Sequence, residues 1–159
     1  MGLLFCSVMG GGISNQFLAV WHAISNDRAQ RGMLEAAARE PLRLGQDLWD
    51  IISNEVHWIN VEATKIEDIR NDALHSPLWG YQRGEKETII IPVAGLGHRR
   101  AKKLQEAKRG LLAEFRYCRD AALILTDYVK DIEEFLGARG PRTWPERPSL
   151  PNRGKTNRC

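Results

Sequence analysis

The chain has 159 residues, of which 43% are hydrophobic and 27% charged, values that are ordinary for a globular protein and suit one domain with a real core. The net charge of +3 is uneven, because residues 138–159 hold six basic side chains and one acid, or +5, which leaves −2 for the rest. The net charge of −2 over residues 1–137 excludes binding of nucleic acid through an overall basic charge of this part, so any basic surface on it must be local.

The three cysteines, Cys6, Cys118 and Cys159, are scattered without metal-ligand spacing. They fit a reducing compartment better than a disulfide framework. The apolar opening, residues 1–9, is short and follows no basic residue, which argues against a signal peptide, and no apolar run is long enough to span a bilayer. We therefore expect a cytoplasmic protein with no membrane partner.

The N-terminal third is expected to begin with a short flexible segment, residues 1–12, because a run of three glycines interrupts it. Ser14 or Asn15 then caps a first helix, and residues 25–27 form either a break or the N-cap of a second helix that ends at Pro41. The aromatic Trp21 and the histidines His22 and His57 are interpreted as packing residues.

A long helix is expected from Pro41–Gln46 to about His75, because its apolar residues recur at steps of three and four. These residues are Leu44, Leu48, Ile51, Ile52, Val56, Ile59, Ala63, Ile66, Ile69 and Ala73. A second long helix is expected from His98 to Leu136 on the same grounds.

Residues 78–97 separate the two long helices and have a different pattern. A β-branched run at 88–93 follows the turn-like residues 82–86, so a small hairpin that pairs 78–81 with 88–91 is predicted as an insertion. After Gly137 the chain has four prolines, few apolar residues and excess charge. Residues 138–159 are therefore expected to be a disordered basic tail.

The predicted fold class is all-α: a four- to five-helix bundle over residues 13–137, with two long antiparallel helices and the hairpin-like insertion between them. The most informative residues lie where the first long helix ends. Arg70, Asn71 and His75 fall within six residues, followed by Pro77, which stops the helix. At 100° per residue, Asn71 and His75 are about 40° apart, and Arg70 is about 140° from His75.

This Arg-Asn-x-x-x-His spacing, placed between two long helices, resembles the signature of the HEPN superfamily. These proteins are small and all-α, and many are metal-independent endoribonucleases, including toxins. The resemblance implies that Arg70, Asn71 and His75 are catalytic: His75 acts as general acid or base, Arg70 stabilises charge on the phosphate, and Asn71 orients His75 or hydrogen-bonds the phosphate. It also implies a homodimer that pairs two motifs, and an antitoxin or regulatory protein as a candidate partner. We also expect no cofactor and no metal, the latter because in this ribonuclease interpretation the ribose 2′-OH supplies the nucleophile.

Basic residues near the motif are candidates for binding the RNA backbone. They are Arg83 and Lys86 at the hairpin tip, and Arg99, Arg100 and Lys103 in the first turns of the last helix. The basic residues at the start of the last helix are equally typical of a helix face that is simply exposed to solvent. Asp72 lies inside the motif, where it disfavours a phosphate or else orients the imidazole of His75.

Three functions are consistent with these patterns. The leading one is a HEPN-like endoribonuclease acting as a toxin or as a defence or stress effector. The second is a catalytically silent HEPN-like dimer that binds RNA, a nucleotide or a partner protein. The third is a helical interaction protein in which the motif is a coincidence.

Overall fold

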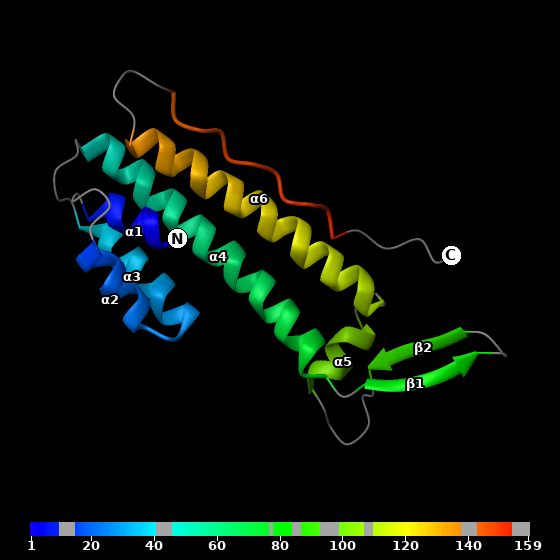
Figure 1. The fold of residues 1–159 in the computed structure, drawn as a ribbon. Helices are drawn as coiled ribbons and strands as arrows, with labels where there is room; N and C mark the ends of the chain where they lie inside the picture. Colours follow the sequence, from blue (N-terminus) through cyan, green and yellow to red (C-terminus); the bar gives the residue numbers. More distant parts are fainter. Residues whose placement is uncertain are drawn as a thin grey trace. The chain divides into compact units, whose positions relative to one another are not determined.

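The computed structural model describes residues 1–9, 15–40, 46–76, 78–83, 87–92, 99–106, 110–137 and 143–153. These residues are mostly helical, as the sequence predicts, so the all-α class is confirmed (Figure 1). The helices are α1 (Gly2–Val8), α2 (Asn15–Ala23), α3 (Asp27–Arg39), α4 (Gln46–Leu74), α5 (Arg99–Glu106) and α6 (Leu111–Gly137). None of the described helices combines the length and apolar character needed to cross a membrane.

The chain divides into two compact units rather than the single domain expected for residues 13–137. The first unit comprises Met1–Thr64 and Ile124–Ser149, and the second comprises Lys65–Leu123 and Leu150–Cys159. Helices α4 and α6, with 29 and 27 residues, therefore contribute to both units.

The N-terminal segment, which was expected to be flexible, forms the helix α1 over residues 2–8 and has buried apolar side chains. Leu4 is fully buried, and Phe5 and Val8 are nearly so. The ring centroid of Phe5 lies 5.5 Å from that of Trp21 and 6.3 Å from that of Phe17 in α2. Burial of these apolar side chains, worth about 1.5–3 kcal/mol each, offsets the entropy lost in ordering the segment.

The core of the first unit is formed by α1–α3 with the adjoining parts of α4 and α6, which run in opposite directions there (Figure 1). Asn26 caps α3, because its Oδ1 accepts from the backbone N–H of Arg28 and of Ala29, at 2.9 and 3.1 Å. The prediction of an N-cap at residues 25–27 is thus confirmed. The largest fully buried side chains described in this unit are those of Leu4, Cys6, Leu34, Ile52, Val56, Ile59 and Ile132.

The second unit contains the end of α4, two strands, α5 and the start of α6. Strands β1 (Leu78–Arg83) and β2 (Glu87–Pro92) pair antiparallel, with Tyr81 opposite Ile89, and α5 packs on β2. The continuous helix expected from His98 to Leu136 is instead two helices. The backbone carbonyl of Gly110 accepts from the N–H of Ala113 and of Glu114, so α6 starts afresh at this residue of low helix propensity.

Residues 143–153, part of the tail that was expected to be disordered, contact the helices of each unit. The indole of Trp144 packs edge-on against the ring of Phe135, with centroids 4.9 Å apart, and joins the core of the first unit. In the second unit, Arg153 Nη2 lies 3.0 Å from Oε2 of the fully buried Glu114. These contacts hold an extended, proline-rich segment that lacks regular hydrogen bonds of its own. The remaining parts of the predicted tail, 138–142 and 154–159, lie outside the described residues.

Candidate functional site

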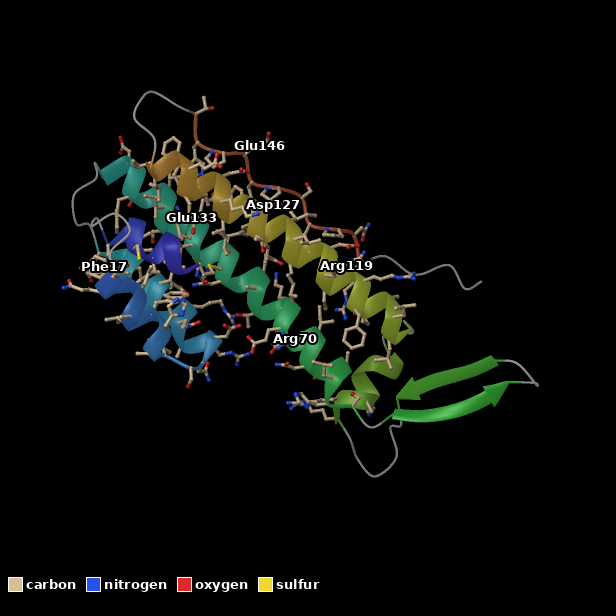
Figure 2. All side chains as sticks on the ribbon, in the orientation of Figure 1. Phe17, Arg70, Arg119, Asp127, Glu133 and Glu146 are labelled. Carbon is tan, nitrogen blue, oxygen red and sulfur yellow. The ribbon has the colours of Figure 1, made fainter. Side chains whose placement is uncertain are left out.

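The Arg70-Asn71-His75 motif occupies the last turn of α4, in the second unit. The backbone N–H of His75 donates to the carbonyl of Asn71 at 3.0 Å, so the helical pattern continues one residue past Leu74. The side chains of Arg70 and His75 are exposed and that of Asn71 is half-buried. Figure 2 shows Arg70 on the green end of α4. Because Ala73 between them is buried, this end of the helix is anchored while its cation and imidazole remain accessible.

Two contacts tie the motif to its surroundings. The buried Ser76 hydroxyl donates to the carbonyl of Asp72, which satisfies a backbone acceptor at the helix end. The carboxylate of Asp72 pairs with Arg100 from the first turn of α5, with 3.6 Å between Oδ1 and Nε. Asp72 therefore has a cation beside it, which lessens its repulsion of a phosphate, although a half-exposed pair is weak and screened by salt.

The other candidate RNA-binding residues are only partly gathered here. Arg99 and Arg100 start α5 with exposed side chains, and Arg100 is brought to the motif through Asp72. Lys103 lies further along α5, and Arg83 ends β1 opposite Glu87. Lys86 and His98 lie outside the described residues. Arg100 is thus the candidate RNA-binding residue that an ion pair links to the motif.

Within one chain, the motif is a set of separate groups rather than a closed network. Among the described residues, no hydrogen bond or ion pair joins the side chains of Arg70, Asn71 and His75 to one another. His75 is also the single histidine in the described part of the second unit. No group of three or more His, Cys, Asp or Glu that could hold a metal ion occurs in the described ranges.

A second polar cluster lies in the first unit, between α3 and α4, and was not foreseen. His57 is exposed, so its interpretation as a packing residue is wrong, and its Nδ1 lies 2.9 Å from Glu35 Oε1. The buried Asn60 donates to Glu35 Oε2 at 3.3 Å, and Arg39 pairs with the same carboxylate. The hydrogen bond from His57 is the main reason that the pKa of Glu35 is lowered. His22 is also exposed, whereas Trp21 is buried as predicted.

A third cluster, also in the first unit, joins α4 and α6 to residues 143–149. Glu55 accepts a hydrogen bond from the Tyr128 hydroxyl at 2.9 Å and two from Arg147. Burial, followed by the hydrogen bond to Glu55, raises the pKa of Tyr128 to about 12. Glu35 and His57 are 22 residues apart, and Glu55 and Arg147 are 92 apart. No spacing rule in the sequence links partners this distant.

Comparison with protein-family models, with curated proteins and with solved structures finds no match to this chain.

Proposed function

We propose that the protein is a metal-independent endoribonuclease of HEPN type, with a composite active site formed by Arg70, Asn71 and His75 from two copies of the chain. The observation that carries the proposal is the exposure of Arg70, near the C-terminal end of the 29-residue α4, and of His75, one residue past that end. A permanent cation and a titratable imidazole, both accessible at one helix end, suit phosphate chemistry.

In the proposed reaction, a histidine imidazole takes the proton of a ribose 2′-OH, and the freed 2′-oxygen attacks the adjacent phosphorus. The bond from phosphorus to the 5′-oxygen breaks, and this oxygen receives a proton from the second imidazole. Arg70 stabilises the charge that develops on the non-bridging oxygens. The products are a 2′,3′-cyclic phosphate and a 5′-hydroxyl end, and no metal is needed because the substrate supplies the nucleophile.

The proposal includes a homodimer because base and acid roles need two groups, and two copies of the chain supply two His75 imidazoles. The exposed side chains of Arg99 and Arg100, the latter beside the motif through Asp72, support an RNA path over the start of α5. Asp72 itself favours the second candidate, a silent HEPN-like dimer that binds RNA, a nucleotide or a partner protein, because a carboxylate beside the phosphate opposes catalysis.

The test is cleavage of total cellular RNA in EDTA by the wild type, Arg70→Ala and His75→Ala. His22→Ala and Arg116→Ala serve as matched controls, because both replace an exposed residue of the same type on another helix. We expect each motif variant to lose at least about 100-fold in rate, as for a missing acid, base or charge-stabilising group, while both controls retain activity. Product ends are identified by mass spectrometry.

Circular dichroism and sedimentation must first show that the variants retain their fold and oligomeric state. Cleavage that persists in both motif variants would refute the assignment of the site. A folded, dimeric wild type that cleaves no RNA would favour the silent dimer.

A further inference from the structure

An open groove of about 540 Å³ lies in the first unit along the exposed face of α4, beside Arg147. Its lining includes four residues of α4 that follow one another at steps of about one helical turn: Ile51, Glu55, Trp58 and Val61. Ile51 is 40% exposed and Val61 37% exposed, so apolar surface remains uncovered on both sides of the arginine. The groove is separate from the Arg70-Asn71-His75 site.

The guanidinium of Arg147 is held from two directions in this groove. Its Nε and Nη2 donate to Oε2 and Oε1 of Glu55, at 3.0 and 2.8 Å, in a bidentate pair. Its Cζ also lies 5.0 Å from the centroid of the Trp58 ring, which adds a cation–π contact. A planar fork that matches a carboxylate and covers an aromatic ring is specific to arginine, because a lysine ammonium cannot make both contacts in this geometry.

The receiving side of this contact is preorganised, whereas the arginine side is not. The Glu55 side chain is only 12% exposed, and the Tyr128 hydroxyl fixes its Oε2 from α6. The Trp58 ring is fixed edge-on against the Tyr128 ring, at 5.8 Å between centroids. Arg147, by contrast, is 44% exposed and belongs to a segment without secondary structure, flanked by Pro145 and Pro148.

We propose that this groove is a binding site for an extended, arginine-bearing peptide segment of a partner protein, and that residues 143–149 of the chain occupy it as a resident ligand. Arginine recognition comes from Glu55 and Trp58, and Ile51 and Val61 receive an apolar neighbour of the incoming arginine. A partner must displace Arg147 to bind, so the resident segment lowers the apparent affinity of the groove for the partner. The proposal does not depend on ribonuclease activity.

The experiment uses a fluorescein-labelled peptide with the sequence of residues 143–153 as the probe, and full-length protein as the receptor. Anisotropy is measured with the wild type, Arg147→Ala, the double variant Arg147→Ala/Glu55→Gln, and Arg116→Ala as a matched control for loss of an exposed arginine. A second vacated receptor, Trp144→Ala/Arg147→Ala, removes both anchors of the resident segment in the first unit. A peptide carrying Arg147→Lys tests the requirement for a guanidinium.

We expect saturable, one-to-one binding to Arg147→Ala and to Trp144→Ala/Arg147→Ala. Binding to the wild type and to Arg116→Ala should be at least about tenfold weaker, because a tethered segment competes at an effective concentration on the order of millimolar. Adding Glu55→Gln, or using the Arg147→Lys peptide, should each weaken binding by at least about tenfold.

Three results would overturn the proposal. The first is no binding to either vacated receptor when circular dichroism shows both to be folded. The second is binding that Glu55→Gln leaves unchanged. The third is a wild-type dimer that dissociates in Arg147→Ala, which would assign the groove to the segment of a second copy rather than to a partner protein.

Discussion

The pair between Glu55 and Arg147 should contribute a measurable coupling energy to the stability of the first unit. The perturbation is a double-mutant cycle with Glu55→Gln, which keeps an acceptor for Tyr128, and Arg147→Met, which keeps most of the aliphatic stem. The cycle isolates the interaction of the two charges from the loss of each side chain alone.

The magnitude follows from the geometry and the exposure of the two groups. Fully exposed ion pairs contribute about 0.2–1 kcal/mol, and hydrogen bonds to charged groups about 1.5–3 kcal/mol. The pair is bidentate, with Glu55 12% exposed and Arg147 44% exposed, so solvent screens one side only. We therefore expect a coupling energy of about 1–2 kcal/mol, between the two classes.

Urea unfolding followed by tryptophan fluorescence measures this energy, because four of the five tryptophans, Trp21, Trp49, Trp58 and Trp144, belong to the first unit. A control cycle uses Lys130 and Asp127 of the same unit, whose Nζ and Oδ1 lie 3.2 Å apart and whose side chains are 62% and 72% exposed. The control coupling should stay below about 0.5 kcal/mol. A Glu55–Arg147 coupling no larger than that of the control would refute the claim that the groove holds its arginine.

Two further predictions concern burial. Leu4→Ala should lower the free energy of unfolding by about 2–5 kcal/mol because Leu4 is fully buried, whereas Leu112→Ala, at a 62% exposed position, should change it by less than about 0.5 kcal/mol. Equal urea midpoints for the two variants would contradict the docking of α1. For Tyr128, the raised pKa of about 12 means that the contribution of its protonated hydroxyl is complete below about pH 10 and is lost as the pH rises toward 12. Tyr128→Phe should remove this part of the alkaline decline, and absorbance at 295 nm should lose its highest-pH transition; an unchanged profile would contradict the burial of that hydroxyl.

Local pattern in the sequence was sufficient for the elements whose apolar residues repeat over several turns. The steps of three and four from Leu48 to Ala73 specify α4, and the cap at Asn26 specifies the start of α3, because both signals depend on neighbours within one or two turns. Local sequence signals also predicted that Arg70, Asn71 and His75 lie at a helix end, as they do in the structure.

Local pattern failed where a partner is distant or where one residue changes the backbone. The opening helix is too short to be stable alone and forms against Trp21 and the rest of the core, so composition suggested flexibility. Gly110 separates α5 from α6 although the apolar stripe continues through it, since a glycine costs about 1 kcal/mol in a helix and its carbonyl serves a new start.

The clusters around Glu35 and Glu55, and the course of residues 143–153, were decided by tertiary structure alone. Charge and proline content made this last segment look disordered, yet a carboxylate 92 residues away, an aromatic ring and a core surface fix it in place. Sequence thus determined the start of α3, the course of α4 and which helix end carries Arg70 and His75. The packing of those helices decided which charges meet, because contact between distant residues depends on the fold and leaves no period in the sequence.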